Sequence, residues 1–289
     1  MGKIIWLASY PKSGNTWLRA FLHNLLRDPK EAYSLDKMTD YSMGDSHGPT
    51  YQKFLRKPVK EMTDEEIAIL RPKVQELFTK RGPDNIFVKT HNALVDYLDR
   101  PMHYMEYTGG AIYVIRNPLD MVVSHADHYG LSIDQSIANT GLEELKVGSG
   151  IFAYEIHCSW SRHVESWTGK PSPGLHVMRY EDMSQRPVEA FAGLTQFLRL
   201  PVSRERLQRA IDHSSFNSLR KLEEKAGFAE RSEKSKYFFR QGKVGGWRNV
   251  LTRAQVEAVV AVHEKQMRRF GYWPVKDWPA EAESAKALA

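Results

Sequence analysis

The segment from residue 3 to residue 26 constrains the fold of this chain more than any other stretch. It begins with an apolar run, IIWL, which leads into the loop ASYPKSGNT, and leucine or phenylalanine then recurs at positions 18, 21, 22 and 25. The apolar run predicts a buried strand at 3–9, and the later spacing predicts an amphipathic helix at 14–26. A strand that turns through a glycine-containing loop into a helix is typical of α/β proteins that bind an anion at the helix start.

The loop differs from the classical phosphate-binding loop in where its lysine lies. The classical pattern is G-x-x-x-x-G-K-[ST]. Here Ser9 stands at the first glycine, Gly14 and Thr16 match, Asn15 replaces the lysine, and Lys12 lies inside the loop instead. Backbone amides at the helix start can still hold an anion, which the lysine would approach from another side. The alternative is a plain strand–turn–helix with an exposed lysine.

Strand and helix patterns alternate along the rest of the chain. Further strands are predicted at 86–89, 111–115 and 175–179, and helices at 63–80, 151–167, 187–198, 204–211 and 254–270. Residues 28–58 are predicted to be irregular, and 130–150 to form a mobile loop. The alternation predicts a single α/β domain at 1–277, with a central, mainly parallel sheet flanked by helices, and a flexible tail at 278–289.

Three polar loops follow predicted strands at one edge of this sheet, where ligands of such sheets bind. The second loop contains Lys89 and His91, although a histidine at a strand end is more often structural than catalytic. The third begins with Arg116, whose planar guanidinium suits phosphate, and Ser124 follows two turns into the next helix. A helix-capping segment with a surface arginine is the alternative for the third loop. The three loops together predict a ligand site at this edge.

Composition narrows the classes of function. The chain has 289 residues and a formal net charge of +6, which suits an anionic partner, but it has no run of five or more Lys or Arg. No apolar stretch reaches the length of a membrane-spanning helix, and the N-terminus has no signal-peptide pattern. A single cysteine, Cys158, excludes an internal disulfide and argues against a cysteine zinc site. We therefore expect a cytoplasmic protein without a membrane span.

The first loop resembles the opening signature of the cytosolic-type sulfotransferases. YPKSGNTW is similar to their Y-P-K-S-G-T-T-W. The resemblance implies that the loop holds the 5′-phosphosulfate of 3′-phosphoadenosine 5′-phosphosulfate (PAPS), with Lys12 at the leaving oxygen and Trp17 stacked on the adenine. The cofactor residues implied here are Lys12, Ser13, Gly14, Asn15, Thr16 and Trp17.

The second and third loops extend the resemblance. VKTHNAL is similar to the K-T-H-L-P segment of the family, which implies that His91 is the catalytic base and that Lys89 adds positive charge beside the transferring group. An imidazole suits the task because it can take a proton from a hydroxyl near neutral pH. Asn92 follows the histidine where the family has leucine, so the acceptor contacts there differ. YVIRNPLDMVVSHADHY resembles the second signature, which implies that Arg116 and Ser124 bind the 3′-phosphate.

The C-terminal half carries further matching segments. MRYEDM and HSSFNSLRK resemble family segments at the adenine, which implies that Tyr180, Ser214 and Phe216 contact the base. FFRQGKVGGWRN resembles R-K-G-x-x-G-D-W-K-N, which implies that Arg240, Gln241 and Gly242 close over the 3′-phosphate, with glutamine in place of a lysine. A dimer motif of the family would fall at 248–257, where Arg253 replaces a valine. The sequence therefore leaves undecided whether the protein forms a homodimer.

The resemblance spans about residues 3–272 and implies a P-loop-NTPase-like sulfotransferase fold. The implied reaction moves the sulfuryl group of PAPS to a hydroxyl, less readily an amine, of a small apolar or aromatic acceptor and releases PAP, without a metal. An ATP-dependent kinase is the second candidate, but Asn15 replaces its lysine and no clear acidic magnesium site is present. A nucleic-acid-binding protein is the third candidate, and the scattered basic residues argue against it.

Overall fold

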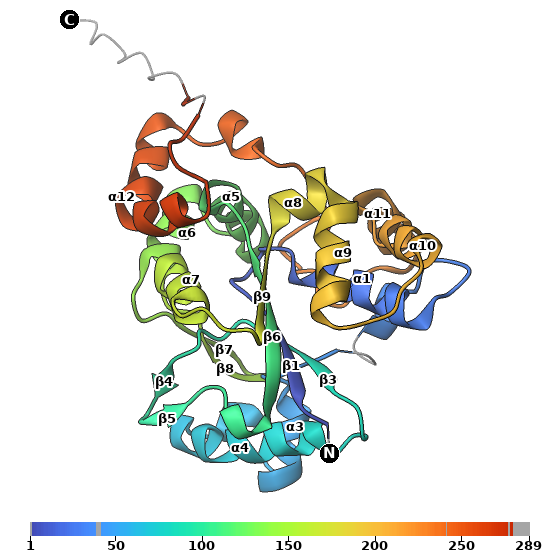
Figure 1. The fold of residues 1–289 in the computed structure, drawn as a ribbon. Helices are drawn as coiled ribbons and strands as arrows, with labels where there is room; N and C mark the ends of the chain where they lie inside the picture. Colours follow the sequence, from blue (N-terminus) through green and yellow to red (C-terminus); the bar gives the residue numbers. More distant parts are fainter. Residues whose placement is uncertain (1, 39–41, 241, 277, 280–289) are drawn as a thin grey trace, which may run out of the picture.

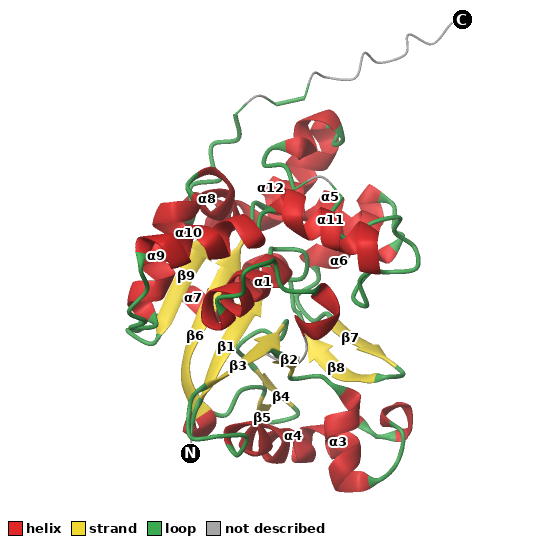
Figure 2. Ribbon diagram, turned by 90° about the vertical axis from the view of Figure 1, so that its right-hand side faces the viewer, coloured by secondary structure: helices red, strands yellow, loops and turns green. Residues whose placement is uncertain are grey.

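The computed structural model describes residues 2–38, 42–240, 242–276 and 278–279. These residues build an α/β fold (Figure 1) around a five-stranded sheet with the strand order β2-β3-β1-β6-β9 (Figure 2). Each strand pairs with its neighbours in parallel. The strands are β1 Ile4–Ser9, β2 Met43–Gly44, β3 Ile86–Thr90, β6 Thr108–Ile115 and β9 Leu175–Arg179. The predicted single α/β domain with a mainly parallel central sheet is confirmed.

The strand β1 is buried along its whole length because helices cover both faces of the sheet (Figure 2). Successive side chains of a strand point to opposite faces. Accordingly, Trp6 packs in one apolar cluster with Tyr113, whereas Leu7 packs in a second cluster with Ile112 and Phe21. The continuous apolar run in the sequence therefore reports a strand between two cores.

The helices divide between these two clusters. One cluster receives side chains from α1 Asn15–Arg27, α8 Tyr180–Gln185, α9 Pro187–Phe197 and α10 Arg204–His213. The other receives them from α3 Gly48–Leu55, α4 Asp64–Thr79, α5 Pro118–Tyr129, α6 Ile133–Gly141, α7 Trp160–Thr168 and α12 Arg253–Arg269. A third, smaller cluster joins α11 Phe216–Ala226 to α1. Short 3₁₀ helices lie at η1 Leu35–Lys37, η2 Val59–Glu61, η3 Met105–Tyr107 and η4 Gly246–Asn249.

Two hairpins lie outside the main sheet. They pair β4 Asp96–Tyr97 with β5 Arg100–Pro101, and β7 Lys146–Ser149 with β8 Phe152–Ile156. The prediction of one helix at 151–167 is therefore wrong, because the segment is β8 followed by α7. Cys158 takes a left-handed backbone conformation, and the Ser159 side chain accepts from the amide of Arg162, so the strand ends there and the helix begins.

Other parts of the sequence prediction also need correction. The predicted mobile loop at 130–150 contains α6 and β7, and the predicted irregular stretch at 28–58 contains η1, β2 and α3. In the predicted tail at 278–289, Trp278 packs against Trp273, with their ring centroids 6.4 Å apart. Beyond residue 279 the tail prediction lies outside the described residues. Across the described ranges, we find no helix that is both long and apolar enough to cross a bilayer.

Candidate active site

A cavity of about 900 Å³ lies beyond the carboxyl ends of β1, β3 and β6. Its wall brings together residues that the sequence scatters over more than two hundred positions. The predicted site residues on this wall are Lys12, Gly14, Asn15, Thr16, Trp17, Lys89, His91, Arg116, Ser124, Tyr180, Phe216, Arg240 and Gly242. The Ser214 hydroxyl instead donates within α10, to the carbonyl of Ala210 at 2.8 Å. Gln241 lies outside the described residues.

The first loop is shaped by residues with left-handed backbones. Gly14 has φ +108°, and a Cβ atom there would lie 2.8 Å from the Tyr180 ring, so no larger residue fits without displacing that ring. Gly14 is also the N-cap of α1 and supplies no side-chain cap, which leaves the first-turn amides available to an anion. The Asn15 amide donates to the carbonyl of Leu7 at 2.8 Å. Asn15 therefore ties the loop to β1, in the position where a classical loop has its lysine.

Lys12 and Arg116 lie side by side in the cavity. Arg116 Nη1 donates to the carbonyl of Lys12 at 3.0 Å, and its guanidinium lies 4.2 Å from the centroid of the Tyr180 ring. Burial, and next the positive charge of Arg116, lower the pKa of Lys12 to about 7. A group of bound anionic oxygens would reverse this shift, because it would place negative charge beside both cations.

Several buried polar atoms on or beside this wall have no hydrogen-bond partner among the described residues. They are Ser13 Oγ, Trp17 Nε1 and Arg116 Nε. A buried donor without a partner costs about 1–3 kcal/mol, so a polar ligand that pairs with these three donors would be stabilised here. Trp17, Tyr180 and Phe216 form an aromatic wall beside them. The cofactor end of the cavity therefore fits a ligand with both anionic groups and a flat ring.

His91 is half-buried where the loop after β3 enters the cavity. Its Nδ1 lies 2.8 Å from the carbonyl of Ser9. A carbonyl only accepts, so Nδ1 carries the proton and Nε2 is left with a lone pair. Burial, and next the charge of Lys89, hold the pKa of His91 well below its usual value. The ring is therefore neutral at neutral pH and able to take a proton.

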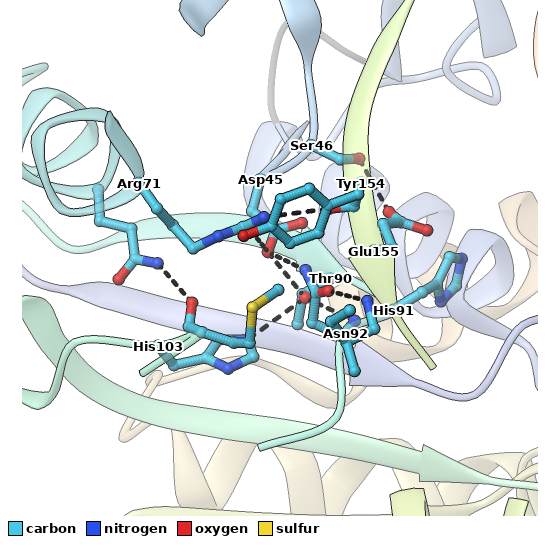
Figure 3. A network of polar contacts seen from close by, with 12 residues as sticks. Asp45, Ser46, Arg71, Thr90, His91, Asn92, His103, Tyr154 and Glu155 are labelled. Atoms are coloured by element: carbon cyan, nitrogen blue, oxygen red, sulfur yellow. Dashed lines mark hydrogen bonds and ion pairs between the residues drawn. The ribbon is translucent and has the colours of Figure 1, made fainter. Parts of the chain in front are cut away.

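The buried carboxylate of Asp45, which directly follows β2, holds the backbone that carries His91 (Figure 3). Asp45 Oδ2 accepts from Thr90 Oγ1 at 2.9 Å and from Asn92 Nδ2 at 2.8 Å, and the Asp45 amide donates to the carbonyl of Lys89 at 3.0 Å. These contacts reach residues on both sides of His91. Arg71 lies 3.9 Å from the same carboxylate oxygen and supplies its counter-charge.

A second carboxylate closes the cofactor end. Glu230 forms an ion pair with Arg19 at 2.6 Å and accepts from Thr16 Oγ1 at 3.4 Å. Burial alone would raise the pKa of Glu230, but the charges of Arg19 and Lys89 outweigh burial and lower it to about 2.

On α5, Asp120 accepts from the amides of residues 245 and 247 at 2.6 and 3.0 Å, so it fixes the segment after Gly242 beside the cavity.

The sequence analysis did not find Asp45, Asp120, Glu155 or Glu230. Asp45 lies in a stretch predicted to be irregular, and Glu155 lies in one predicted to be helical. Their partners lie far away along the chain, so no local pattern marks them. Among the residues that the structure describes, no group of three His, Cys, Asp or Glu is arranged to hold a metal ion.

Comparisons with known proteins identify the family of this chain. The family model for the sulfotransferase domain matches residues 3–271. Mouse sulfotransferase 1B1 is 28% identical over 270 residues, which cover 91% of this chain and 82% of the relative. Cytosolic sulfotransferase 1 of Arabidopsis thaliana is 25% identical over 284 residues, covering 91% and 78%.

Solved structures share the fold. Mouse sulfotransferase SULT7A1 complexed with PAP aligns with a TM-score of 0.59 at 22% identity and covers 92% of this chain and 85% of its own. Retinol dehydratase in complex with androsterone and the inactive cofactor PAP aligns with a TM-score of 0.62 at 18% identity, covering 97% and 82%. Since the family model matches nearly the whole length, the chain belongs to the sulfotransferase domain family.

Proposed function

We propose that this protein transfers the sulfuryl group of PAPS to a hydroxyl of a small molecule and releases PAP. One observation carries the proposal: the free first-turn amides of α1, the cations Lys12 and Arg116, and the neutral His91 all lie on one cavity wall. The partnerless donors Ser13 Oγ, Trp17 Nε1 and Arg116 Nε fit a phosphorylated nucleotide. Two structural relatives are described as complexes with PAP, which supports the same ligand class.

The chain's own residues account for the chemistry. PAPS supplies a sulfuryl group on a phosphate leaving group. His91 accepts the proton of the attacking hydroxyl at Nε2, because Nδ1 is committed to Ser9. Lys12, at the start of α1, offsets the negative charge that grows on the leaving oxygen, and Lys89 adds positive charge beside the transferred group. Arg116 and Ser124 bind the 3′-phosphate, and Trp17 and Tyr180 hold the base.

The acceptor occupies the other end of the cavity. Its wall there includes Val147, Ile151 and Phe152 of the β7–β8 hairpin and Tyr129 of α5. These side chains favour an acceptor with an apolar or aromatic body. Retinol and androsterone, which appear in complexes of retinol dehydratase, are small molecules of that general kind.

Location and assembly are further proposals. We infer a cytoplasmic location because the Arabidopsis relative is named a cytosolic sulfotransferase, and cell fractionation that finds the protein in membranes or outside the cell would contradict this.

A homodimer remains a prediction. Arg253, which replaces an apolar residue of the dimer motif, pairs with Glu257 of its own helix at 3.1 Å. Light scattering that shows a monomer at micromolar concentration would end the dimer prediction.

The direct test is a screen with radiolabelled PAPS. Phenols, aliphatic alcohols, amines and glycosides are incubated with the protein in the presence of EDTA, and label in the acceptor is counted. We expect transfer to at least one hydroxyl compound without added metal. Thermal stabilisation by Mg-ATP and not by PAP, with no transfer to any acceptor, would favour a kinase instead.

A further inference from the structure

Glu155 presents a carboxylate to the acceptor end of the cavity, close to the reacting histidine. It lies on β8, and its side chain is 16% exposed. The same wall carries the apolar side chains of Val147, Ile151 and Phe152. It has no part in the proposed transfer of the sulfuryl group, and its position therefore needs another explanation.

Two neighbours hold the carboxylate in place. Ser46 Oγ donates to Oε1 at 2.8 Å (Figure 3). His157 Nε2 donates to Oε2 at 2.9 Å. Each carboxylate oxygen can accept about two hydrogen bonds, so each keeps capacity for one more donor. Burial would raise the pKa of Glu155, but the hydrogen bond from His157 and the positive charge of Lys89 are among the interactions that outweigh burial and hold this pKa well below its usual range. The group is therefore ionised at neutral pH.

The charges in the cavity are distributed unevenly. Lys12, Lys89 and Arg116 lie at the three loops, where they would face the phosphates and the transferring group of PAPS. Glu230 on the same wall is paired with Arg19. Once the three cations are matched by PAPS, Glu155 is the charge beside the apolar side chains of the hairpin. An apolar acceptor that expels water from this carboxylate costs free energy, whereas an acceptor with an O–H or N–H group replaces the lost water. An acidic acceptor adds repulsion between like charges.

We propose that Glu155, held by Ser46 and His157, selects acceptors that carry a second hydrogen-bond donor, a hydroxyl or ammonium group, on an apolar body, and that it rejects acidic acceptors. The inference rests on the proposed sulfotransferase function and deepens it from a reaction type to a class of acceptor. It assigns specificity to the carboxylate and leaves proton transfer to His91.

The test compares four phenols that differ only in one para substituent. They are para-ethylphenol, para-(hydroxyethyl)phenol, para-(aminoethyl)phenol and para-hydroxyphenylacetate. For the wild type, kcat/KM for the amine and the alcohol should exceed that for the acid by about tenfold or more, since a lost charged contact is worth roughly 1.4 kcal/mol or more. In Glu155→Gln, the ratio of amine to acid should fall toward one. Ratios within one variant cancel any common change in the chemical step.

Two further variants test whether the kcat/KM ratios depend on the charge at Glu155 itself, and not on the net charge of the protein or on its folding. Glu144→Gln removes one negative charge from an exposed position at the start of the hairpin, outside the cavity wall, and should leave the four ratios unchanged. Ser46→Ala keeps the carboxylate but removes one of its two donors, and should reduce the amine-to-acid ratio less than Glu155→Gln does. An amine-to-acid ratio that is the same in Glu155→Gln and wild type would overturn the inference, as would a wild type that prefers the acid.

Binding of the same four compounds to the enzyme–PAP complex, measured by calorimetry, gives a readout that does not need turnover. Equal dissociation constants for the amine and the acid in the wild type would also overturn the inference. Failure of the proposed function has a different signature, namely no binding of PAP and no transfer from PAPS by the wild type. Thermal unfolding of each variant with and without PAP shows whether it is folded and whether it binds PAP.

Discussion

At the scale of single residues, burial in the cavity favours the neutral forms of its reactive side chains. Lys12 and His91 both have pKa values below their ordinary ones, chiefly because they are buried and secondly because they face other cations. For the histidine the neutral form is the working form, since a base must accept a proton. For the lysine the charged form is the useful one, so binding of an anionic ligand must return a proton to it.

This difference predicts how PAP affinity depends on pH. Between about pH 7 and about pH 9, Lys12 is increasingly neutral in the free protein, while bound phosphate raises its pKa toward its ordinary value near 10.4. The dissociation constant for PAP should therefore increase as the pH rises, by up to about tenfold per pH unit, and calorimetry in buffers of different ionisation enthalpy should detect proton uptake.

Two variants check that this lysine is responsible. Lys12→Met should bind PAP weakly and without the pH dependence, and Lys12→Arg should keep binding without proton uptake, because arginine stays charged throughout the range. A pH dependence that persists unchanged in Lys12→Arg would show that another group titrates.

At the scale of elements, the short strand β2 joins the sheet to the reacting histidine and to the acceptor wall. Asp45 binds residues on both sides of His91, and the next residue, Ser46, binds Glu155 on β8. Asn92 completes the link, because its Oδ1 accepts from the amide of Ile156 at 2.7 Å. The histidine loop and the acceptor hairpin are thus fixed to one buried network.

Replacement of Asp45 tests this network. Asp45→Ala removes the carboxylate that accepts from Thr90 and Asn92 and leaves the buried Arg71 without its counter-charge, which should cost roughly 3–5 kcal/mol of folding free energy. Asp45→Asn keeps an amide oxygen for both donors, so it should lose less stability and retain more turnover.

Urea unfolding gives the stabilities of the two variants, and kcat and KM for PAPS give their activities. Because the carboxylate acts on the histidine loop and not on the cofactor loop, kcat should fall more than KM rises. If Asp45→Asn were as inactive as Asp45→Ala, the negative charge of Asp45, and not its hydrogen bonds, would hold the His91 loop in place.

The elements also show how far the sequence could predict the structure. The strands β1, β3 and β9 and the loops after β1 and β3 were predictable because apolar runs and local motifs mark them. The β7–β8 hairpin was not, since residues 151–167 have helical spacing and only the buried contacts of Ala153 and Ile156 make the first part a strand. Asp45 and Glu155 were missed because their partners come from other elements.

At the scale of the whole molecule, one cavity is assembled from segments spread between residues 11 and 247. Binding of a ligand to it therefore depends on the fold as a unit. A ligand present at one hundred times its dissociation constant stabilises the folded state by about 2.7 kcal/mol. We expect PAP to raise the melting temperature by roughly 4–5 °C at that concentration in one cooperative transition, with or without EDTA.

Calorimetric scans with PAP, with AMP as a control that lacks the 3′-phosphate, check this expectation. AMP should give a smaller shift, because it leaves the Arg116 side of the cavity without a phosphate. Equal shifts for the two nucleotides would mean that Arg116 and Ser124 do not bind the 3′-phosphate.

The central claim is that His91 takes the acceptor proton during transfer of the sulfuryl group from PAPS. The most direct measurement is single-turnover transfer from radiolabelled PAPS by the wild type and His91→Ala, together with PAP binding to both. The account predicts that His91→Ala slows the chemical step by roughly 10²–10⁴-fold while its dissociation constant for PAP stays close to that of the wild type. Near-normal transfer by His91→Ala that still binds PAP would contradict it.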